Sequence, residues 1–254
     1  MKTMFPEERH KQILNILETA TRATVADLTK AVGASEATIR RDLQLLESEG
    51  KLKRSHGGAI LKALTTNNAF YFQEKFVKNK AEKDYIASLA QHFIKDKDII
   101  ILNVSTITLR LAHLLKGKKI TVITNSIAIA EVLSDSPSIS LIVTGGINRA
   151  NTKSLVGTLT ISTLKMVNAN KAFIAINAID EKTGFTTPNL EDAIVKKTMI
   201  EQAKEIFFLA ESSKFDQFSF AKVSDISEPD MIITDKKLSP EIKARYEKYL
   251  VIHN

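Results

Sequence analysis

Seven short apolar segments recur along the larger part of the chain, and stretches with helical spacing of apolar residues lie between them. The segments are DIIILN (98–103), KITVITN (119–125), SISLIVTGG (138–146), KAFIAINAI (171–179), EIFFLAE (205–211), DMIITD (230–235) and YLVIH (249–253). Apolar strands that alternate with helices are typical of a mainly parallel sheet covered on both faces. The pattern therefore predicts an α/β domain, with helices near 86–93, 106–115, 127–133, 155–166, 191–203 and 240–249.

Composition narrows the class of protein. The 254 residues are enough for two folded units, and the absence of cysteine excludes disulfides and thiol nucleophiles. The first residues mix acids and bases where a signal peptide would be apolar, and no run approaches the ~18 apolar residues of a membrane span. We expect a cytoplasmic protein with no membrane segment, no cofactor and no bound metal. The net charge of +7 favours polyanionic partners.

The first sixty residues predict three helices separated by tight turns. Pro6 suits the first turn of the first helix, Thr24 caps the second helix, and Gly33 ends it. Ser35 caps the third helix, which runs to Gly50. The apolar positions of each helix recur on one side, so the three helices fit a helix-turn-helix unit.

The outward side of the third helix is small, polar and cationic. Opposite its apolar stripe lie Ala37, Arg41, Gln44 and Ser48, with Thr38 and Arg40 on the shoulders. Arginine can read guanine and glutamine can read adenine in a DNA major groove, while a small alanine permits close approach. The alternative is a solvated helix surface with an ion pair such as Glu36 with Arg40.

The next segment, KLKRSHGGAIL (51–61), alternates like a strand and contains paired glycines that suit a tight turn. It predicts a basic wing, in which Lys51, Lys53 and Arg54 would contact DNA phosphates. We interpret His56 as a turn residue that bonds the local backbone.

The stretch VGASEATIRRDLQLLESEGKLKRSHGGAI resembles the winged helix-turn-helix signature of the DeoR family of bacterial sugar-operon repressors. The resemblance implies sequence-specific binding to double-stranded operator DNA through Ser35, Thr38, Arg40, Arg41, Lys53, Arg54 and His56. Together with the helix geometry and the wing, the candidate DNA-binding residues are Ser35, Ala37, Thr38, Arg40, Arg41, Gln44, Lys51, Lys53, Arg54 and His56. Asp42 belongs to the same motif, and we expect it to orient an arginine. The expected domains are a winged helix-turn-helix at 1–61, a linker at 62–74 and an effector domain at 75–254.

Polar residues follow the predicted strands of the larger domain at their carboxyl ends, where ligands bind in parallel sheets. They are hydroxyls, amides, glycines and one lysine at 103–106, 124–126, 144–146, 177–178 and 212–214. Such groups suit an anion such as a sugar phosphate, with Arg149 or Lys214 completing the charge. Each also has a structural alternative: serines that cap helices, glycines that form a turn, and an ordinary ion pair between Asp192 and Lys196.

The larger domain also resembles the DeoR-family sensor domain, in the pieces EKDYIASLA, TVITNS, TGGINR, VGTL, GFTTPN, VKKTMI and SSKF. That domain is similar in fold to ribose-5-phosphate isomerase and binds a phosphorylated sugar. The resemblance implies the effector residues Ser105, Thr106, Thr108, Thr124, Asn125, Gly145, Gly146, Arg149, Asn177, Asp192, Lys196 and Lys214. The chain departs from the family pattern at Asn103 and Asn177, where the family has acids, and its loop 103–108 contains no glycine.

These features predict a transcriptional repressor of a sugar-metabolism operon, controlled by a phosphorylated sugar effector. Because symmetric DNA sites pair with symmetric proteins, we expect a homo-oligomer, a dimer or a tetramer. The alternative is a sugar-phosphate isomerase or deaminase with an accessory DNA-binding module. Asn103 and Asn177 count against an enzyme, because amides cannot serve as general bases. A pure interaction scaffold is a third possibility.

Overall fold

The computed structural model describes residues 5–20, 22–55, 57–61 and 78–254. The chain divides into two compact units, Met1–Asn68 and Ala69–Asn254. Each unit is described by itself below. The expected linker at 62–74 and His56 lie outside the described residues.

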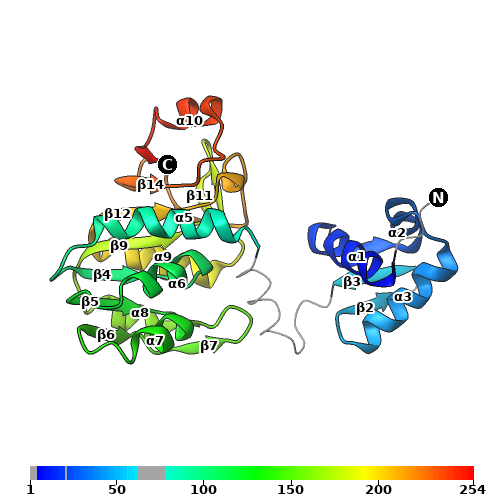
Figure 1. The fold of residues 1–254 in the computed structure, drawn as a ribbon, viewed down its shortest axis with the longest axis horizontal. Helices are drawn as coiled ribbons and strands as arrows, with labels where there is room; N and C mark the ends of the chain where they lie inside the picture. Colours follow the sequence, from blue (N-terminus) through cyan, green and yellow to red (C-terminus); the bar gives the residue numbers. More distant parts are fainter. Residues whose placement is uncertain (1–4, 21, 56, 62–77) are drawn as a thin grey trace. The chain divides into compact units, whose positions relative to one another are not determined.

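The first unit is a three-helix domain with a small antiparallel sheet. Its helices are α1 (Pro6–Ala20), α2 (Val25–Val32) and α3 (Glu36–Ser48), and its strands are β1 (Arg22–Thr24), β2 (Leu52–Ser55) and β3 (Gly58–Leu61). The sheet has the order β1-β3-β2 (Figure 1). The three predicted helices and the wing hairpin are confirmed, whereas β1 was not expected.

Local sequence explains where these helices begin and end. Thr24 and Asp27 form a reciprocal capping box at the start of α2, and Gly33 ends that helix with a φ of 70°. Apolar residues of all three helices and of β2 are buried together in one core, which includes Ile13, Leu17, Leu28, Ile39, Leu43, Leu46 and Leu52.

The second unit is built on a seven-stranded sheet whose neighbouring strands all pair in parallel. Its strand order is β15-β14-β12-β9-β4-β5-β6. The strands are β4 (Ile99–Leu102), β5 (Ile120–Thr124), β6 (Ile139–Val143), β9 (Ala169–Ala175), β12 (Ala203–Leu209), β14 (Met231–Ile233) and β15 (Ile252–His253). Each of the seven predicted apolar segments overlaps one of these strands, and the predicted α/β class is confirmed.

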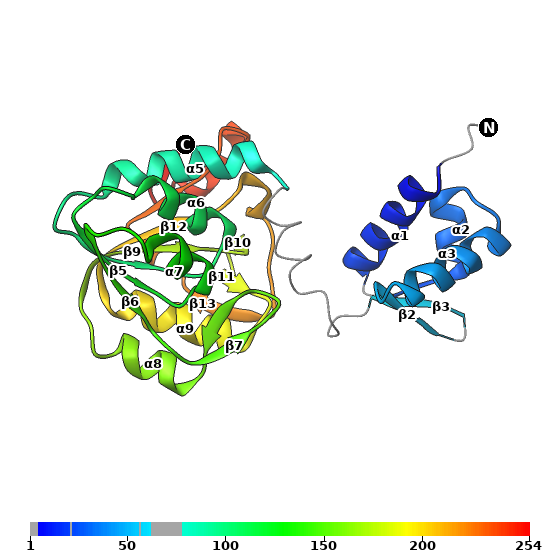
Figure 2. The ribbon, with the colours of Figure 1, turned by 60° about the horizontal axis from the view of Figure 1, so that its bottom comes forward.

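Helices cover both faces of this sheet (Figures 1 and 2). One face packs on α5 (Lys80–Ala90), α6 (Thr106–Leu114) and α7 (Ile127–Leu133), and the other on α8 (Thr158–Leu164), α9 (Leu190–Glu201) and α10 (Pro240–Tyr246). Successive side chains of β4 point to opposite faces of the sheet: Ile100 and Leu102 pack in the core on the α6 side, whereas Ile101 packs in the core on the α9 side.

Two small sheets differ from expectation. The predicted helix at 155–166 begins only at Thr158, because 154–156 form β8 (Ser154–Val156), which pairs with β7 (Ile147–Arg149) in a hairpin. The predicted strand at 171–179 is interrupted at Ile176 and Asn177. After this break β10 (Ala178–Asp180) pairs with β11 (Gly184–Thr187), and β11 pairs with β13 (Ala221–Ser224). The β7–β8 hairpin follows β6 and β10 follows β9, so both additions come after the carboxyl ends of strands of the large sheet.

Candidate DNA-binding and effector sites

The third helix of the first unit is held at its N-terminus by Ser35. The Ser35 hydroxyl accepts a hydrogen bond from the Thr38 amide at 3.2 Å and lies 2.9 Å from the Thr38 hydroxyl. Because Ile39, Leu43 and Leu46 are buried, the opposite side of α3 is left at the surface. Ala37, Arg40, Arg41 and Gln44 are exposed there, as the helical spacing predicted.

The two adjacent arginines of α3 differ in their surroundings. Arg40 pairs with Glu36 at 3.3 Å, with both side chains more than half exposed, so the ion pair considered as an alternative is present. Such an exposed pair contributes little stability and leaves the guanidinium accessible. Arg41 makes no hydrogen bond or ion pair to any residue that the structure describes. Among the described residues, therefore, none occupies the donors of the Arg41 guanidinium.

Asp42 lies on the buried side of the same helix, 6% exposed. Its carboxylate accepts hydrogen bonds from Arg9 Nε at 2.5 Å and Nη2 at 3.0 Å, and it lies 2.9 Å from His10 Nε2. Burial alone would raise the pKa of Asp42, but the hydrogen bonds from Arg9 and His10 outweigh it and hold the pKa below its ordinary value. Asp42 thus orients an arginine, as expected, and that arginine ties α1 to α3.

The wing carries its cations on β2 and the turn before it. Lys51 is exposed and pairs with Glu49 at 2.6 Å. Arg54 is exposed, and its main-chain N–H donates to Glu47 Oε1 at 2.8 Å, which fixes the strand against the end of α3. Lys53 lies on β2 between them, and its side chain lies outside the described residues.

In the second unit, the loop after β4 folds onto the start of α6. The Ser105 hydroxyl accepts from the amides of Ile107 at 3.1 Å and Thr108 at 2.9 Å, and the Thr108 hydroxyl donates to the Asn103 carbonyl at 2.6 Å. Two of the amides at this helix N-terminus therefore already have an acceptor in Ser105. Thr106 is half-buried beside them.

Asn103 explains one departure from the family pattern. Its Oδ1 accepts from the Ala175 amide at 2.8 Å and its Nδ2 donates to the Ala175 carbonyl at 3.4 Å. Only an amide can both donate and accept here, so Asn103 bridges the ends of β4 and β9 in a way that a carboxylate cannot. The residue is 1% exposed and acts as a structural bridge.

The next strand end is also tied inward. Thr124 Oγ1 donates to the Leu102 carbonyl at 2.8 Å, while Asn125 accepts from the Val104 amide at 3.0 Å and donates to the Leu155 carbonyl at 3.0 Å. Thr124 and Asn125 are both at most 2% exposed. Their polar atoms hold the loops after β4, β5 and the β7–β8 hairpin together.

The paired glycines turn the chain from β6 into β7. Gly146 has a φ of 121°, and a Cβ there would lie 2.2 Å from Thr160 Oγ1 and 2.7 Å from the Val156 carbonyl oxygen. Thr160 Oγ1 donates to the Gly145 carbonyl at 2.7 Å. Close packing against α8 thus explains why the turn contains glycine.

Arg149, at the end of β7, reaches the first turn of α9. Its Nη1 donates to Asp192 Oδ1 at 2.9 Å, and both side chains are about one-fifth exposed. Asn189 caps α9 by accepting from the Asp192 amide at 3.1 Å. A partly exposed arginine therefore stands next to a helix N-terminus.

Lys196, one turn further along α9, is buried. Its ammonium donates to Asn177 Oδ1 at 2.9 Å and lies 3.4 Å from Thr187 Oγ1, and Thr187 Oγ1 also donates to Asn177 Oδ1 at 2.8 Å. An amide at 177 thus supplies Lys196 with a neutral acceptor where the family has an acid. Thr187 was missed by the sequence analysis, although it lies within the quoted GFTTPN segment.

The structure brings most candidate effector residues into two groups. One surrounds the loop 103–108 and the end of β5, and the other combines Arg149 with Asp192 and Lys196 with Asn177. Lys214 lies in the half-buried 3-10 turn η2 (Ser212–Lys214) after β12, and no contact links it to either group among the described residues.

A cluster of buried acids with polar partners, near the end of β12, was not among the candidate residues of the sequence analysis. Glu211 is 8% exposed, accepts from Asn79 Nδ2, and lies 3.8 Å from the ammonium of Lys83 in α5. Asp235, 2% exposed, accepts from the Ser212 amide at 2.7 Å and from its hydroxyl at 2.9 Å. The sequence analysis counted Glu211 as the last residue of the predicted strand segment 205–211, whereas β12 ends at Leu209; an acid at the end of an apolar segment was the available signal.

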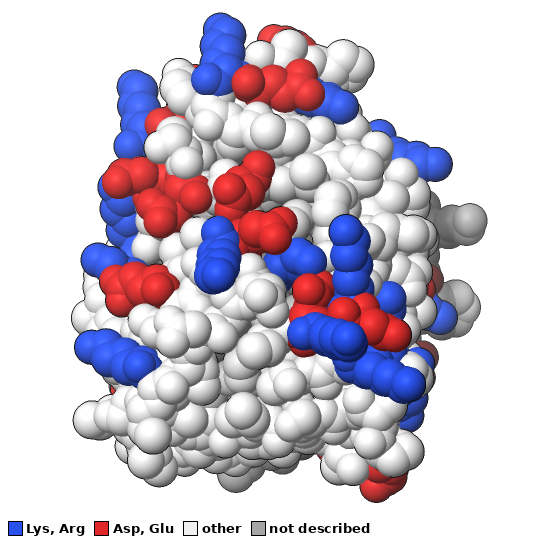
Figure 3. Space-filling view, turned by 90° about the vertical axis from the view of Figure 1, so that its left-hand side faces the viewer, with Lys and Arg blue, Asp and Glu red and all other residues white. Residues whose placement is uncertain are grey.

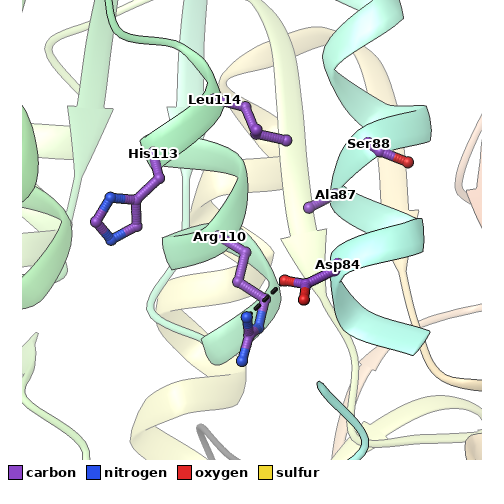
Figure 4. Close-up of a pocket in the computed structure, with 6 residues that line it drawn as sticks. All are labelled: Asp84, Ala87, Ser88, Arg110, His113 and Leu114. Atoms are coloured by element: carbon purple, nitrogen blue, oxygen red, sulfur yellow. Dashed lines mark hydrogen bonds and ion pairs between the residues drawn. The ribbon is translucent and has the colours of Figure 1, made fainter. Parts of the chain in front are cut away.

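A surface pocket lies elsewhere, between α5 and α6 (Figure 4). Across it, Arg110 Nη1 donates to Asp84 Oδ1 at 2.5 Å, and the remaining lining is Ala87, Ser88, His113 and Leu114. This pocket is walled by two helices, and none of the candidate effector residues lines it.

Comparison with known proteins identifies the two units. Residues 9–64 match the family described as the DeoR-like helix-turn-helix domain, and residues 78–236 match the DeoR C-terminal sensor domain. The winged helix-turn-helix and the parallel-sheet sensor together define a transcriptional regulator. The chain belongs to the DeoR family of such regulators.

Curated relatives match over nearly the full chain. The chain is 35% identical to the uncharacterized HTH-type transcriptional regulator YulB of Bacillus subtilis (strain 168), covering 96% of this chain and 95% of that protein. It is 34% identical to the lactose phosphotransferase system repressor of Lactococcus lactis subsp. lactis (98% of each chain) and 36% identical to the HTH-type transcriptional repressor GlcR of Bacillus subtilis (92% and 90%).

Among solved structures, ribose 5-phosphate isomerase A from Methanocaldococcus jannaschii matches with a TM-score of 0.41 and 16% identity, over 54% of this chain and 55% of that chain. No helix within the described ranges has the length and apolar character needed to cross a membrane.

Proposed function

We propose that this regulator is a sequence-specific repressor of a sugar-metabolism operon whose operator affinity is controlled by a phosphorylated sugar. The DNA-binding part of the proposal rests on the position of Arg41, which is exposed on α3 and has no ion pair among the described residues. Asp42, on the buried side of the same helix, holds α3 to α1 through Arg9. In this proposal, Arg41, Arg40 and Gln44 read base edges in the major groove. Ala37 permits close approach, and Ser35 and Thr38 position the helix end.

The wing supplies affinity rather than sequence preference. Lys51, Lys53 and Arg54 neutralise phosphates along one strand of the DNA, and we include His56, which follows β2 in the sequence, among the DNA-binding residues. Lys51 exchanges Glu49 for a phosphate on binding, which reduces its net contribution. The domain boundaries proposed from the sequence, 1–61, 62–74 and 75–254, place the entire wing with the recognition helix.

The effector part rests on two cations at the carboxyl ends of the sheet. Arg149 is partly exposed at the N-terminus of α9, and the buried ammonium of Lys196 has neutral oxygens of Asn177 and Thr187 as neighbours. We assign the phosphate to these cations and the start of α6, near Ser105, Thr106 and Thr108. Thr124, Asn125, Gly145 and Gly146 shape the loops, and Lys214 completes the rim.

The effector must bind the DNA-competent and DNA-incompetent states with different affinity, since a ligand of equal affinity shifts nothing. The direct test is a gel-shift assay on the promoter region of the chain's own gene, with and without a panel of sugar phosphates. Specific retardation that one sugar phosphate reverses supports the proposal. Equal retardation of random DNA, or the absence of any sugar-phosphate effect, contradicts it.

Supporting evidence for the enzymatic alternative would be turnover of a ribose, fructose or glucosamine phosphate. The names of the curated relatives place them among regulators, and the amides of Asn103 and Asn177 hold structural roles. Loss of such turnover in Asp192→Ala would establish an active site at α9.

A further inference from the structure

The seven-stranded sheet ends in an open edge at β6. Within the described residues β6 pairs with β5 alone, so no strand covers its other side. The Thr144 amide donates to the Thr124 carbonyl at 3.1 Å. Since alternate residues of a parallel strand bond the same neighbour, the main-chain groups of Leu141 and Val143 point away from the sheet.

This edge lacks the features that normally protect a strand from pairing. Exposed edges usually carry lysine, proline, a bulge or a covering element. From Ser136 to Asn148 the sequence SPSISLIVTGGIN contains no charged residue, and its one proline precedes the strand. Val143 is 41% exposed and Ile147, just beyond the glycine turn, is 71% exposed.

The opposite edge of the same sheet differs. There β15 has only two residues, and the segment leading to it, KARYEKY (243–249), is rich in charge. In Figure 3, the end of the unit that carries β6, α7 and β7 in Figure 1 lies at the bottom, where few charged side chains are in view. The neighbouring helix α8 (TLTISTL) is also uncharged. The unprotected edge is therefore confined to one side of the sheet.

The chemistry of this edge selects its occupant. A nucleic acid or a charged peptide finds no counter-charge on β6, whereas a second copy of the strand offers the same uncharged apolar surface and complementary donors and acceptors. A two-fold axis through the strand also closes the assembly at two copies, which avoids fibre growth. We propose that β6 is a homodimerisation edge, at which the β6 strand of a second copy pairs antiparallel about Leu141 and joins two seven-stranded sheets into one.

The register follows from the strand itself. Pairing all five residues places Leu141 opposite the Leu141 of the second copy and Val143 opposite its Ile139. The two Leu141 residues can then exchange both of their main-chain hydrogen bonds. At each end of the pairing the Val143 N–H can donate to the Ile139 carbonyl, because the Ile139 N–H already donates to the Ser136 carbonyl at 3.0 Å. This inference goes beyond the proposed function. Its tests use neither DNA nor a sugar, so a negative result would count against the dimerisation proposal and not against the proposed function.

The first test is the mass of the full chain by sedimentation equilibrium. The wild-type chain should be a dimer or a multiple of one, and Val143→Lys should halve the mass at the same concentration, because each lysine would place an unpaired charge against Ile139 of the second copy. Val251→Lys is the matched control: the same substitution at a 56% exposed valine beside the opposite edge, which should keep the wild-type mass. A monomeric wild type, or a Val143→Lys variant of wild-type mass, overturns the proposal.

The second test uses single cysteines in a chain that contains none. Opposed hydrogen-bonded residues of an antiparallel pair have Cα atoms about 5.5 Å apart, within the ~4.4–6.8 Å that a disulfide spans. Leu141→Cys should therefore form a covalent dimer with diamide on non-reducing gels. Two Val143→Cys residues would lie roughly 14 Å apart, four strand positions at ~3.4 Å each, and should not cross-link. Cross-linking of the more exposed Cys variant at 143, or equal cross-linking of both, overturns the register and the interface, even if Val143→Lys fails to fold.

Discussion

Arg41 and Asp42 are neighbours in the chain that face opposite sides of α3. Asp42 is buried against Arg9 and His10 of α1, while Arg41 is exposed and has no ion-pair partner among the described residues. Asp42 thus holds α3 against α1, and Arg41 presents its guanidinium on the exposed side of the same helix. This relationship separates stability from recognition in two adjacent positions.

Arg41→Ala should weaken specific DNA binding by about 1–3 kcal/mol and relax the sequence preference, since one bidentate base contact is lost. The measurement is a titration of operator and random DNA by fluorescence anisotropy at one salt concentration. Arg40→Ala is the internal comparison, and we expect a smaller loss because Arg40 must first leave Glu36. Equal losses on operator and random DNA for Arg41→Ala would contradict a base-reading role.

Arg54→Ala and Lys53→Ala should weaken binding to all DNA sequences by similar factors. Each should lower the slope of log affinity against log salt by about one, because one phosphate contact releases about one counterion. Titrations at several salt concentrations measure the slope. An unchanged slope would exclude a phosphate contact at that position.

Asp42→Asn should destabilise the first unit by about 1–3 kcal/mol at pH 7, because Arg9 loses its charged partner. The pKa of Asp42 is lowered in the folded state, so its stabilisation is complete above about pH 4, the ordinary value, and is lost as the pH falls through the lowered pKa. The difference between wild type and variant should therefore shrink in acid. Hydrogen exchange of the α3 amides, corrected for intrinsic rates, measures this difference. A difference that does not decrease as the pH falls would contradict the assignment.

Gly146→Ala should destabilise the sensor unit by more than Gly117→Ala. Both glycines have positive φ values, 121° and 93°, but a Cβ at Gly146 meets Thr160 and Val156, whereas none lies within 4 Å at Gly117. Backbone strain alone costs roughly 1–3 kcal/mol, and the clash adds to it only at Gly146. Urea unfolding followed by circular dichroism compares the two variants, and equal losses would show that the turn relaxes away from α8.

Lys196→Met should abolish thermal stabilisation by the effector sugar phosphate, because a buried cation is removed from the site. Lys197→Met is the control: the neighbouring lysine is exposed, and its loss should leave the stabilisation unchanged. The measurement is the shift in melting temperature of the full chain with sugar phosphate added. Equal shifts in both variants would place the ligand away from α9.

Regular elements with strong periodicity were predictable from the sequence, and long-range polar contacts were not. The apolar segments marked all seven strands of the large sheet, and Ser35, Thr24 and Gly33 marked helix ends because capping is a local interaction. The β7–β8 hairpin was missed because Leu155 and Val156 read equally well as a helix start.

The partners of the site residues depend on which strands are neighbours. Asp192 is spaced to pair with Lys196 along α9, yet it bonds Arg149, 43 residues away. Asn103 looked like a lost acid, and only the adjacency of β4 and β9 shows its amide bridging the two strands. The positions of the candidate site were predictable, whereas the roles of its side chains required the topology.

The contact between Arg149 and Asp192 has a consequence for how strongly any anion is held there. A phosphate that binds the Arg149 guanidinium must displace the Asp192 carboxylate, so the net binding free energy is the difference between two ion pairs. The displaced carboxylate would then lie beside the phosphate, which also carries negative charge. Relief of that repulsion requires the Asp192 side chain to turn away from the anion. An anion bound at Arg149 would thereby change the contacts at the start of α9.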